Sequence, residues 1–355
     1  MPETATSPSF SCPVPVTQRD RIVLGHGSGG RLSAELLRDV FLPLFANPVL
    51  DRMDDQAIVE IGGARVAFTT DSFVVQPLIF PGGDIGSLAV HGTVNDLAMG
   101  GARPLFLSAG FILEEGFPTE TLRQIAASMA EAAAQCGVAI VTGDTKVVER
   151  GKGDGLFINT TGIGVVPEPV RLSASQARPG DRVILSGFIG DHGIAILANR
   201  EGLEFETEIR SDSAPLHNLV AAMLAASPDA NAIRCLRDPT RGGVSSTLNE
   251  IAAQSRVSIQ IDETAIPVRE QVRGACELLG LDPLYVANEG KLVAIVAPEA
   301  SDAILRAMRR DARGADAVII GTVGEESPGL VTMKTVFGST RIVDLLAGEQ
   351  LPRIC

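Results

Sequence analysis

The sequence predicts an α+β fold of two similar α/β-sandwich domains. Its 355 residues, 45% of them hydrophobic, are enough to bury two cores. Stretches with the alternation typical of strands and stretches with helical periodicity follow one another along both halves of the chain. The turn sequence Arg-Pro-Gly-Asp at 178–181 separates the two halves, so we expect the domain boundary near it.

The domain organisation expected from these patterns has four parts. Residues 1–20 have neither the basic start nor the apolar middle of a secretory signal and are expected to form a disordered leader. Residues 21–168 form the first domain and residues 169–335 the second. Residues 336–355 form a C-terminal tail that ends on Cys355.

Local signals define the individual elements. In the first half, the apolar patterns predict strands at 21–24, 57–61, 65–70, 104–113, 138–144 and 156–166, and helices at 31–45, 86–101 and 119–136. Gly62-Gly63 predicts a hairpin, and Gly137 predicts a left-handed helix end. In the second half, they predict strands at 183–190, 257–262, 292–298, 317–323, 332–337 and 340–345, and helices at 193–202, 213–227, 244–255, 268–280 and 301–312.

Composition excludes several classes of function. The formal net charge of −13 repels phosphate backbones, and the absence of Trp leaves few stacking platforms, so nucleic-acid binding is not expected. No apolar run approaches the roughly 18 residues that a membrane-spanning helix needs. The five cysteines are odd in number and form no C-x-x-C pair, which indicates reduced thiols and a cytoplasmic protein.

A glycine loop, Gly-His-Gly-Ser-Gly-Gly at 25–30, precedes the first helix and matches G-x-G-x-x-G. A dinucleotide site would need an acid after the next strand, but Asp51, Asp54 and Asp55 precede that strand. A Walker A loop would need Lys and Ser or Thr where Arg31 and Leu32 stand. The loop is thus either a phosphate site at a helix N-terminus or a surface turn, and the loop alone does not decide between them.

Carboxylates favour the phosphate site. Asp71 and Asp144 are expected at strand ends, and Asp96 lies in Val-Asn-Asp-Leu at 94–97. Together with Asp54 and Asp55 they are expected to face one edge of the fold. Mg²⁺ takes oxygen ligands and bridges carboxylates to phosphates, so the first domain is expected to bind Mg²⁺ and ATP.

Several motifs together resemble one family. These are HGSGGR, TTDSFVV, GTVNDLAMGGA, VTGDTKVV, RDPTRGG, ANEGKLV and the terminal PRIC. They resemble the HypE family of hydrogenase maturation factors, which are carbamoyl dehydratases of the aminoimidazole ribonucleotide (AIR) synthetase superfamily, a group that also includes selenophosphate synthetase and thiamine-phosphate kinase. The resemblance runs from about Ile22 to Cys355. It implies homodimers in which the N-terminal sheets form a barrel.

The resemblance also implies a reaction and its residues. A partner carbamoyltransferase would load a carbamoyl group onto Cys355. ATP would then drive dehydration of this thiocarboxamide to a thiocyanate, with Glu289 and Lys146 handling the protons. The cyanide would pass to the iron of a nickel-iron hydrogenase on a scaffold of the HypC-HypD type. The implied ATP contacts are Gly27, Gly29, Gly30, Asp71, Asp96, Asp144, Thr145 and Arg241, and the implied Mg²⁺ ligands are Asp54, Asp55, Asp71, Asp96 and Asp144.

The tail sequence fits a mobile carrier. Pro352 disfavours a helix, and the seven residues after Gly348 can span roughly 20–25 Å when extended. The alternative is a kinase or synthetase of the same superfamily that phosphorylates a free small molecule, with the tail as an ordinary surface segment. A scaffold without enzymatic activity would leave Lys146 and Glu289 without a role.

Overall fold

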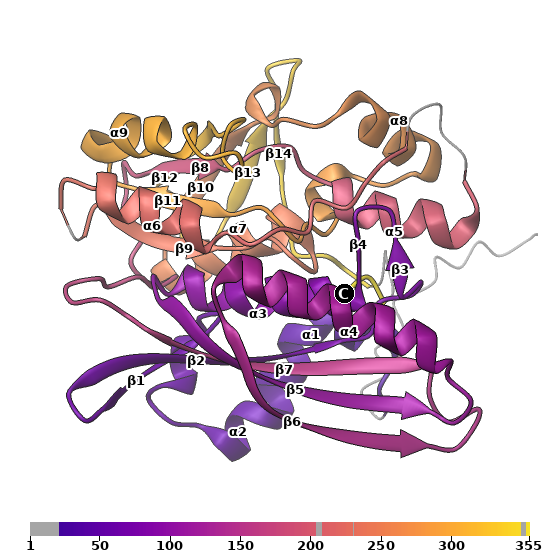
Figure 1. The fold of residues 1–355 in the computed structure, drawn as a ribbon. Helices are drawn as coiled ribbons and strands as arrows, with labels where there is room; N and C mark the ends of the chain where they lie inside the picture. The colour runs from indigo at the N-terminus through magenta and orange to yellow at the C-terminus, as the bar shows by residue number, and fades with distance from the viewer. Residues whose placement is uncertain (1–20, 204–207, 230, 349–352) are drawn as a thin grey trace, which may run out of the picture.

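The computed structural model describes residues 21–203, 208–229, 231–348 and 353–355, and the expected leader lies outside them. Two sheets with their helices lie one above the other (Figure 1). The lower, five-stranded sheet comes from residues 57–165, and the upper, seven-stranded sheet comes from residues 182–342.

The N-terminal sheet has the order β1-β2-β7-β5-β6. All its neighbours are antiparallel except the parallel pair β5 and β6. The strands are β1 (Ala57–Ile61), β2 (Ala64–Phe73), β5 (Arg103–Glu114), β6 (Ala139–Val148) and β7 (Leu156–Val165). The short strands β3 (Ile79–Phe80) and β4 (Gly83–Asp84) form a separate pair.

Helices α3 (Ile85–Met99) and α4 (Thr119–Cys136) lie on the side of this sheet that faces the second domain (Figure 1). The Asp84 side chain starts α3 by accepting hydrogen bonds from the Gly86 and Ser87 amides, which helix formation would otherwise leave without partners. Gly137 ends α4 in the left-handed conformation, as the sequence predicts. Among the described residues no helix packs on the opposite face of the sheet, where Phe68, Phe106 and Ile163 are exposed.

The C-terminal sheet has the order β14-β13-β10-β12-β8-β11-β9. Its strands are β8 (Arg182–Leu185), β9 (Ile233–Arg237), β10 (Ser258–Asp262), β11 (Val293–Val296), β12 (Val318–Gly324), β13 (Val331–Lys334) and β14 (Thr340–Ile342). Its helices are α5 (Asp191–Glu201), α6 (His217–Ala226), α7 (Gly243–Ser255), α8 (Glu270–Leu279) and α9 (Pro298–Met308), with short 3-10 turns η4 (Glu263–Ala265) and η5 (Pro283–Tyr285). The alternation along β8 divides the core, because Ile184 packs with α6 and α9 while Val183 and Leu185 pack with α7.

One hydrophobic core joins the two domains. Leu97 and Met99 at the end of α3 share it with Leu219 and Met223 of α6 and with Ile304 of α9, and all five side chains are buried. Helix α3 therefore packs on its own sheet and on the second domain. The two domains form a single packed body around it.

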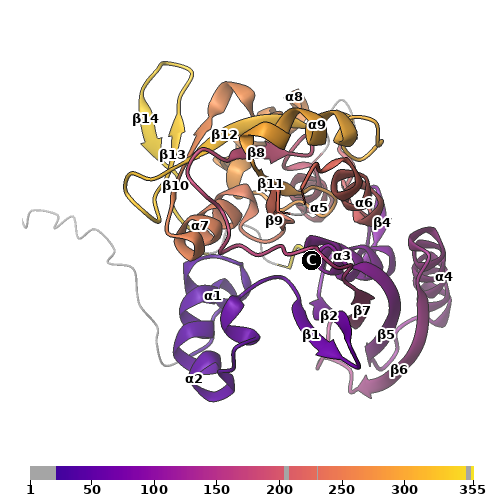
Figure 2. The ribbon, with the colours of Figure 1, turned by 90° about the vertical axis from the view of Figure 1, so that its left-hand side faces the viewer.

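The N-terminal segment forms a separate helical arm (Figure 2). It consists of η1 (Leu24–Gly27), α1 (Arg31–Leu36), a π-helical turn η2 (Leu37–Phe41), α2 (Leu42–Phe45) and η3 (Leu50–Arg52). Leu44 and Phe45 are largely exposed on this arm. The arm stands apart from β1 and lies below α7 in Figure 2.

Three local expectations are wrong, and one strand was not predicted. Residues 21–24 form no strand, because the Val23 amide bonds to the His26 imidazole and the chain turns into η1. Strand β9 was not predicted, since its residues run directly into the turn-like Asp-Pro sequence at 238–239. Asp71 and Asp144 lie inside β2 and β6 rather than at strand ends, and Asp96 lies on α3, so these acids do not share one edge of the sheet.

Candidate active site

A cavity of about 220 Å³ lies where the two domains meet the C-terminus. Residues from both domains line it, together with the last residue of the chain: Asp55, Thr70, Asp71, Gly92, Asp96, Asp238, Thr240, Arg241, Glu289 and Cys355. The fold therefore brings five predicted site residues together with Cys355. They are Asp55, Asp71 and Asp96 of the first domain and Arg241 and Glu289 of the second.

The first domain contributes Asp71 and Asp96. Asp71 lies on β2 in the row that faces α3, and the Thr69 hydroxyl on the same strand donates a 2.8 Å hydrogen bond to Asp96 Oδ2. Gly92 lets α3 approach β2, because a Cβ there would lie 2.9 Å from the Phe73 ring. Burial raises the pKa of Asp71, and burial and nearby carboxyl groups raise the pKa of Asp96 well above its usual range.

Asp54 and Asp55 have different environments. Asp55 lines the cavity, and its Oδ1 forms an ion pair with Arg237 Nη1 at 2.6 Å. Its buried Oδ2 has no hydrogen-bond partner in the described residues. Asp54 instead accepts hydrogen bonds from the Ser173 hydroxyl and the Ala174 amide. Asp54 therefore fastens the chain between the domains, and the structure does not bring it to the cavity.

Asp238 is a cavity residue that the sequence analysis missed. It follows β9, and burial raises its pKa to about 6, with Asp71 adding to the shift. The motif Arg-Asp-Pro-Thr-Arg-Gly-Gly at 237–243 was the available signal, but only Arg241 was selected from it. Arg237 of the same motif holds Asp55 and also forms an ion pair with Glu250.

Glu289 lies on the loop before β11, and its side chain is buried at 3% exposure. Its Oε1 has no hydrogen-bond partner in the described part of the chain, and its amide donates to Asp212 Oδ1 at 3.1 Å. Burial, followed by the fields of Asp238 and Asp71, raises the pKa of Glu289 well above its usual range. A glutamate with a raised pKa is a stronger base when ionised, which suits a proton acceptor.

Cys355 also lines the cavity. Burial is the main cause that raises its pKa, Glu289 and Asp71 raise it further, and Arg241 opposes the shift. Arg353, two residues before the cysteine, forms an ion pair with Asp154. In this position the thiol is neutral at pH 7 and therefore a poor nucleophile.

Backbone hydrogen bonds hold the last residues in place. The Val74 amide donates to the Cys355 carbonyl at 2.9 Å, and the Gln76 amide donates to the Arg353 carbonyl at 3.2 Å. His192 Nε2 lies 2.8 Å from the Ile354 carbonyl, and the Ile354 side chain is buried at 3% exposure. The tail therefore docks like an added strand beside the segment that follows β2.

The glycine loop contacts the C-terminal segment. A Cβ on Gly29, whose φ is +72°, would lie 2.6 Å from the Arg241 carbonyl oxygen, and a Cβ on Gly30 would lie 2.4 Å from the Leu346 carbonyl oxygen. The Gly27 carbonyl accepts a hydrogen bond from Arg241 Nη1 at 3.2 Å. The loop thus packs close to the cavity through Arg241 but does not line it.

Asp144, Thr145 and Lys146 lie on the edge strand β6 and are exposed. Asp144 and Lys146 form an ion pair of 2.6 Å, and their side chains are 67% and 69% exposed. None of these three residues lines the cavity of its own chain.

The cavity suits Mg²⁺ held jointly with phosphate. In the described ranges no three His, Cys, Asp or Glu side chains form a group that could hold a metal ion alone. Mg²⁺ usually keeps water and takes one or two carboxylates plus substrate phosphates. Buried carboxyl groups with raised pKa values and the unpartnered Asp55 Oδ2 provide such ligands, and a cation would relieve their mutual repulsion.

Comparisons with known proteins agree with this arrangement. Family models described as the N-terminal and C-terminal domains of AIR synthase related proteins match residues 53–166 and 178–334. The fold and the cavity between its two domains thus define an AIR synthase related protein.

None of the helices in the described part of the chain is long and apolar enough to cross a membrane.

Individual relatives narrow the family within the AIR synthase related proteins. The carbamoyl dehydratase HypE of Azotobacter vinelandii is 62% identical over 330 residues, covering 93% of this chain and 96% of that protein. A HypE structure from a HypE–HypF complex has a TM-score of 0.83 at 51% identity, covering 88% of this chain and 99% of that one. A HypE structure in complex with ATP has a TM-score of 0.79 at 50% identity, covering 94% of this chain and 100% of that one. The chain belongs to the carbamoyl dehydratase HypE family.

Proposed function

We propose that this protein dehydrates a carbamoyl group on its own Cys355 to a thiocyanate with the use of ATP. The observation that carries the proposal is that Cys355 lies in the same cavity as Glu289, Arg241 and the carboxylates. A free small-molecule substrate would have to displace this thiol. The HypE structure solved with ATP supports nucleotide binding by a protein 50% identical to this one.

The chemistry follows from the poor leaving group. The thiocarboxamide oxygen attacks the γ-phosphorus of ATP and releases ADP, while one N–H proton leaves. The second N–H proton is then removed, the carbon–oxygen bond breaks, and phosphate departs with the oxygen as the C≡N bond forms. Glu289 accepts a proton from nitrogen, and Arg241 faces the departing phosphate. Mg²⁺, held by the cavity carboxylates, would neutralise phosphate charge.

Arg241, Asp71 and Asp96 lie at the cavity and are proposed to serve the nucleotide and its metal, and Asp55 and Asp238 join them as metal ligands. Gly27, Gly29 and Gly30 are proposed to approach the nucleotide when the C-terminal segment moves away. For Asp54 we propose only a supporting role, in which it holds the position of Asp55, because its carboxylate accepts hydrogen bonds from Ser173 and Ala174.

A homodimer would give Lys146, Asp144 and Thr145 a role. Phe68, Ile163 and Phe106 are aligned across three strands on the face opposite α3, and each is at least 40% exposed. An apolar row of this kind marks an interaction surface. We propose that two such sheets pack into a barrel and that β6 of one chain brings Lys146 to the cavity of the other, where it joins in proton transfer.

Complementation tests the dimer. Lys146→Ala and Cys355→Ala proteins should each be inactive alone. If the sites are shared, a re-equilibrated equal mixture should recover about a quarter of wild-type activity, because half of the dimers then carry one intact site. Recovery of no activity, with mixed dimers shown by native mass spectrometry, would mean that Lys146 acts within its own chain or not at all.

Partners, compartment and domain division are proposed as follows. A carbamoyltransferase loads Cys355, in keeping with the solved HypE–HypF complex, and a HypC-HypD type scaffold accepts the cyanide. The described cysteines are free thiols, which suits the cytoplasm. The working division is 21–168 and 169–335, followed by a tail over 336–355 whose first part, β14, pairs with the second sheet.

The decisive experiment weighs the C-terminal peptide. The protein is incubated with the carbamoyl-donor system, with and without ATP. The expected result is a carbamoyl adduct on Cys355 that loses the mass of one water only with ATP. An unmodified Cys355 together with ATP turnover on a free metabolite would replace this proposal with the kinase or synthetase alternative.

A further inference from the structure

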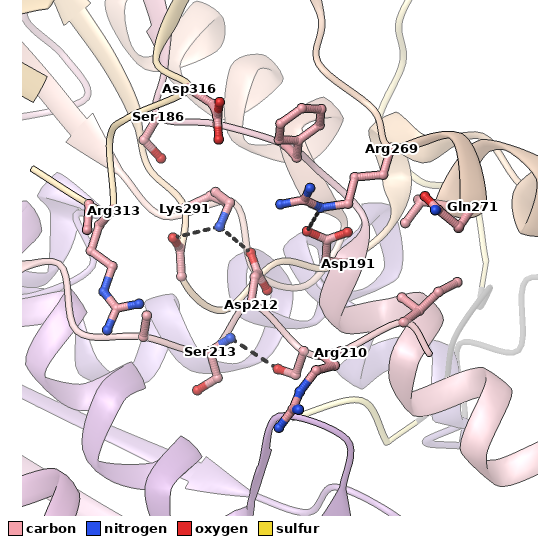
Figure 3. Close-up of a pocket in the computed structure, with 18 of the residues that line it drawn as sticks. Ser186, Asp191, Arg210, Asp212, Ser213, Arg269, Gln271, Lys291, Arg313 and Asp316 are labelled. Atoms are coloured by element: carbon pink, nitrogen blue, oxygen red, sulfur yellow. Dashed lines mark hydrogen bonds and ion pairs between the residues drawn. The ribbon is translucent and has the colours of Figure 1, made fainter. Parts of the chain in front are cut away.

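A second and larger cavity, about 490 Å³, lies within the C-terminal domain (Figure 3). Its walls are the segment before α5, the loop at 208–214, the start of α8, residues 290–291 and the loop after α9. Its volume is in the range of sites for small metabolites. The proposed dehydration does not use it.

Two buried carboxylates form its floor. Asp191 is 6% exposed; its Oδ2 pairs with Arg269 Nε at 3.1 Å, but its Oδ1 has no hydrogen-bond partner in the described ranges. Asp212 Oδ2 forms an ion pair with Lys291 Nζ at 3.2 Å, and Asp212 Oδ1 accepts a hydrogen bond from the Glu289 amide. A buried acceptor without a donor is costly, so Asp191 Oδ1 calls for a ligand that donates a hydrogen bond.

Guanidinium groups lie on another side of the cavity. Arg313, Ser213 and Arg210 follow one another along it in Figure 3. Arg210 meets Glu208 at 3.8 Å, with both side chains exposed, and no ion pair to the Arg313 side chain is present within the described residues. Guanidinium forks match carboxylates well, so this side suits an anionic group.

We propose that this cavity binds a zwitterion of the α-amino-acid class. Its ammonium group lies toward Asp191 and Asp212, and its carboxylate lies toward Arg313 and Arg210. A phosphate would leave Asp191 Oδ1 without a donor and would bring negative charge toward the two floor carboxylates. A simple amine would leave the arginines without an anion.

The position of the cavity links it to the docked tail. Ser211 lines the cavity, and its hydroxyl lies 2.7 Å from His192 Nδ1, while His192 Nε2 lies 2.8 Å from the Ile354 carbonyl. A ligand that shifts Ser211 therefore changes the support of the tail. This second part of the inference rests on the proposed function, whereas ligand binding itself does not.

Calorimetric titration of the full chain without ATP tests the binding. The probes are the standard L-amino acids one by one, with inorganic phosphate and ethylamine as contrasts. At least one amino acid should bind, and Arg313→Ala and Asp191→Asn should each raise its Kd at least tenfold. The matched controls Arg310→Ala and Asp302→Asn change exposed residues outside the cavity and should leave the Kd unchanged.

Other outcomes overturn the inference. These are no binding of any amino acid, tighter binding of phosphate than of every amino acid, or equal binding by Arg313→Ala protein with an unchanged Tm. For the link to the tail, the rate of Cys355 alkylation should change at least threefold with ligand in wild type and not in Ser211→Ala. A dehydratase assay that fails while an amino acid still binds would refute the proposed function and leave the site standing.

Discussion

The buried Ile354 side chain offers a direct test of tail docking. Ile354→Ala removes three carbons from a side chain that is 3% exposed and packs in the N-terminal core. Loss of this burial weakens docking by about 2 kcal/mol. At 1.4 kcal/mol per tenfold, the undocked fraction should rise about 30-fold.

The assay is the rate at which iodoacetamide alkylates Cys355, followed by mass spectrometry of the C-terminal peptide. In the docked state burial holds the thiol neutral and hinders access, so the observed rate follows the undocked fraction. The rate should rise up to about 30-fold, until it reaches that of a free thiol. Ile342→Ala, at a site 63% exposed on β14, is the control and should leave the rate unchanged.

An unchanged alkylation rate in Ile354→Ala protein would refute the reasoning, because it would mean that burial of this side chain does not hold the tail. The same variant should also dehydrate a preloaded carbamoyl group more slowly, since the reacting sulfur spends less time in the cavity. Faster alkylation with unchanged dehydration would show that docking is not needed for the reaction.

Three further outcomes are expected. Cys355→Ala should bind ATP within about twofold of wild type but form no thiocyanate, since a side chain that carries the substrate is not needed to hold the nucleotide; calorimetry and peptide mass measure the two. Glu289→Gln should lower the dehydration rate by about 10²–10⁴, because an amide cannot accept the proton, with little change in Tm, because Gln has nearly the same shape as Glu. Asp238 has its pKa raised from 3.8 to about 6, so Mg²⁺-dependent ATP affinity should fall from pH 7 to pH 5 as this carboxylate takes up a proton. Its contribution to the stability of the folded protein without Mg²⁺ is complete below pH 3.8 and lost above about pH 6, so that protein should be stabilised at pH 5 relative to pH 7. Asp238→Asn should flatten both trends, measured by calorimetric titration and thermal melting.

Local signals predicted the elements they control. The Gly62-Gly63 hairpin and the helix end at Gly137 depend on backbone conformations available to glycine, and both occur as expected. Strand β9 was missed because its pairing with β11 depends on residues more than fifty positions away.

The sequence named part of the cavity lining but not its arrangement. Asp71, Asp96 and Glu289 were named from motifs, and the fold brings them together with Cys355. Asp54 sits one residue from Asp55 but bonds to a different partner, and nothing in the local sequence distinguishes the two carboxylates. His192 was missed because its role requires the last residues of the chain to fold back onto α5.

The shared core around α3 determines which part of the molecule can move. Rotating one domain away from the other would expose Leu97, Met99, Leu219 and Met223 to water, at a cost of about 1.5–3 kcal/mol for each side chain. The docked C-terminal residues, by contrast, rest on a few backbone hydrogen bonds, one isoleucine and the ion pair of Arg353. Under the proposed function, the loaded sulfur therefore enters and leaves the cavity by undocking of residues 353–355, while the two domains keep the cavity walls in place.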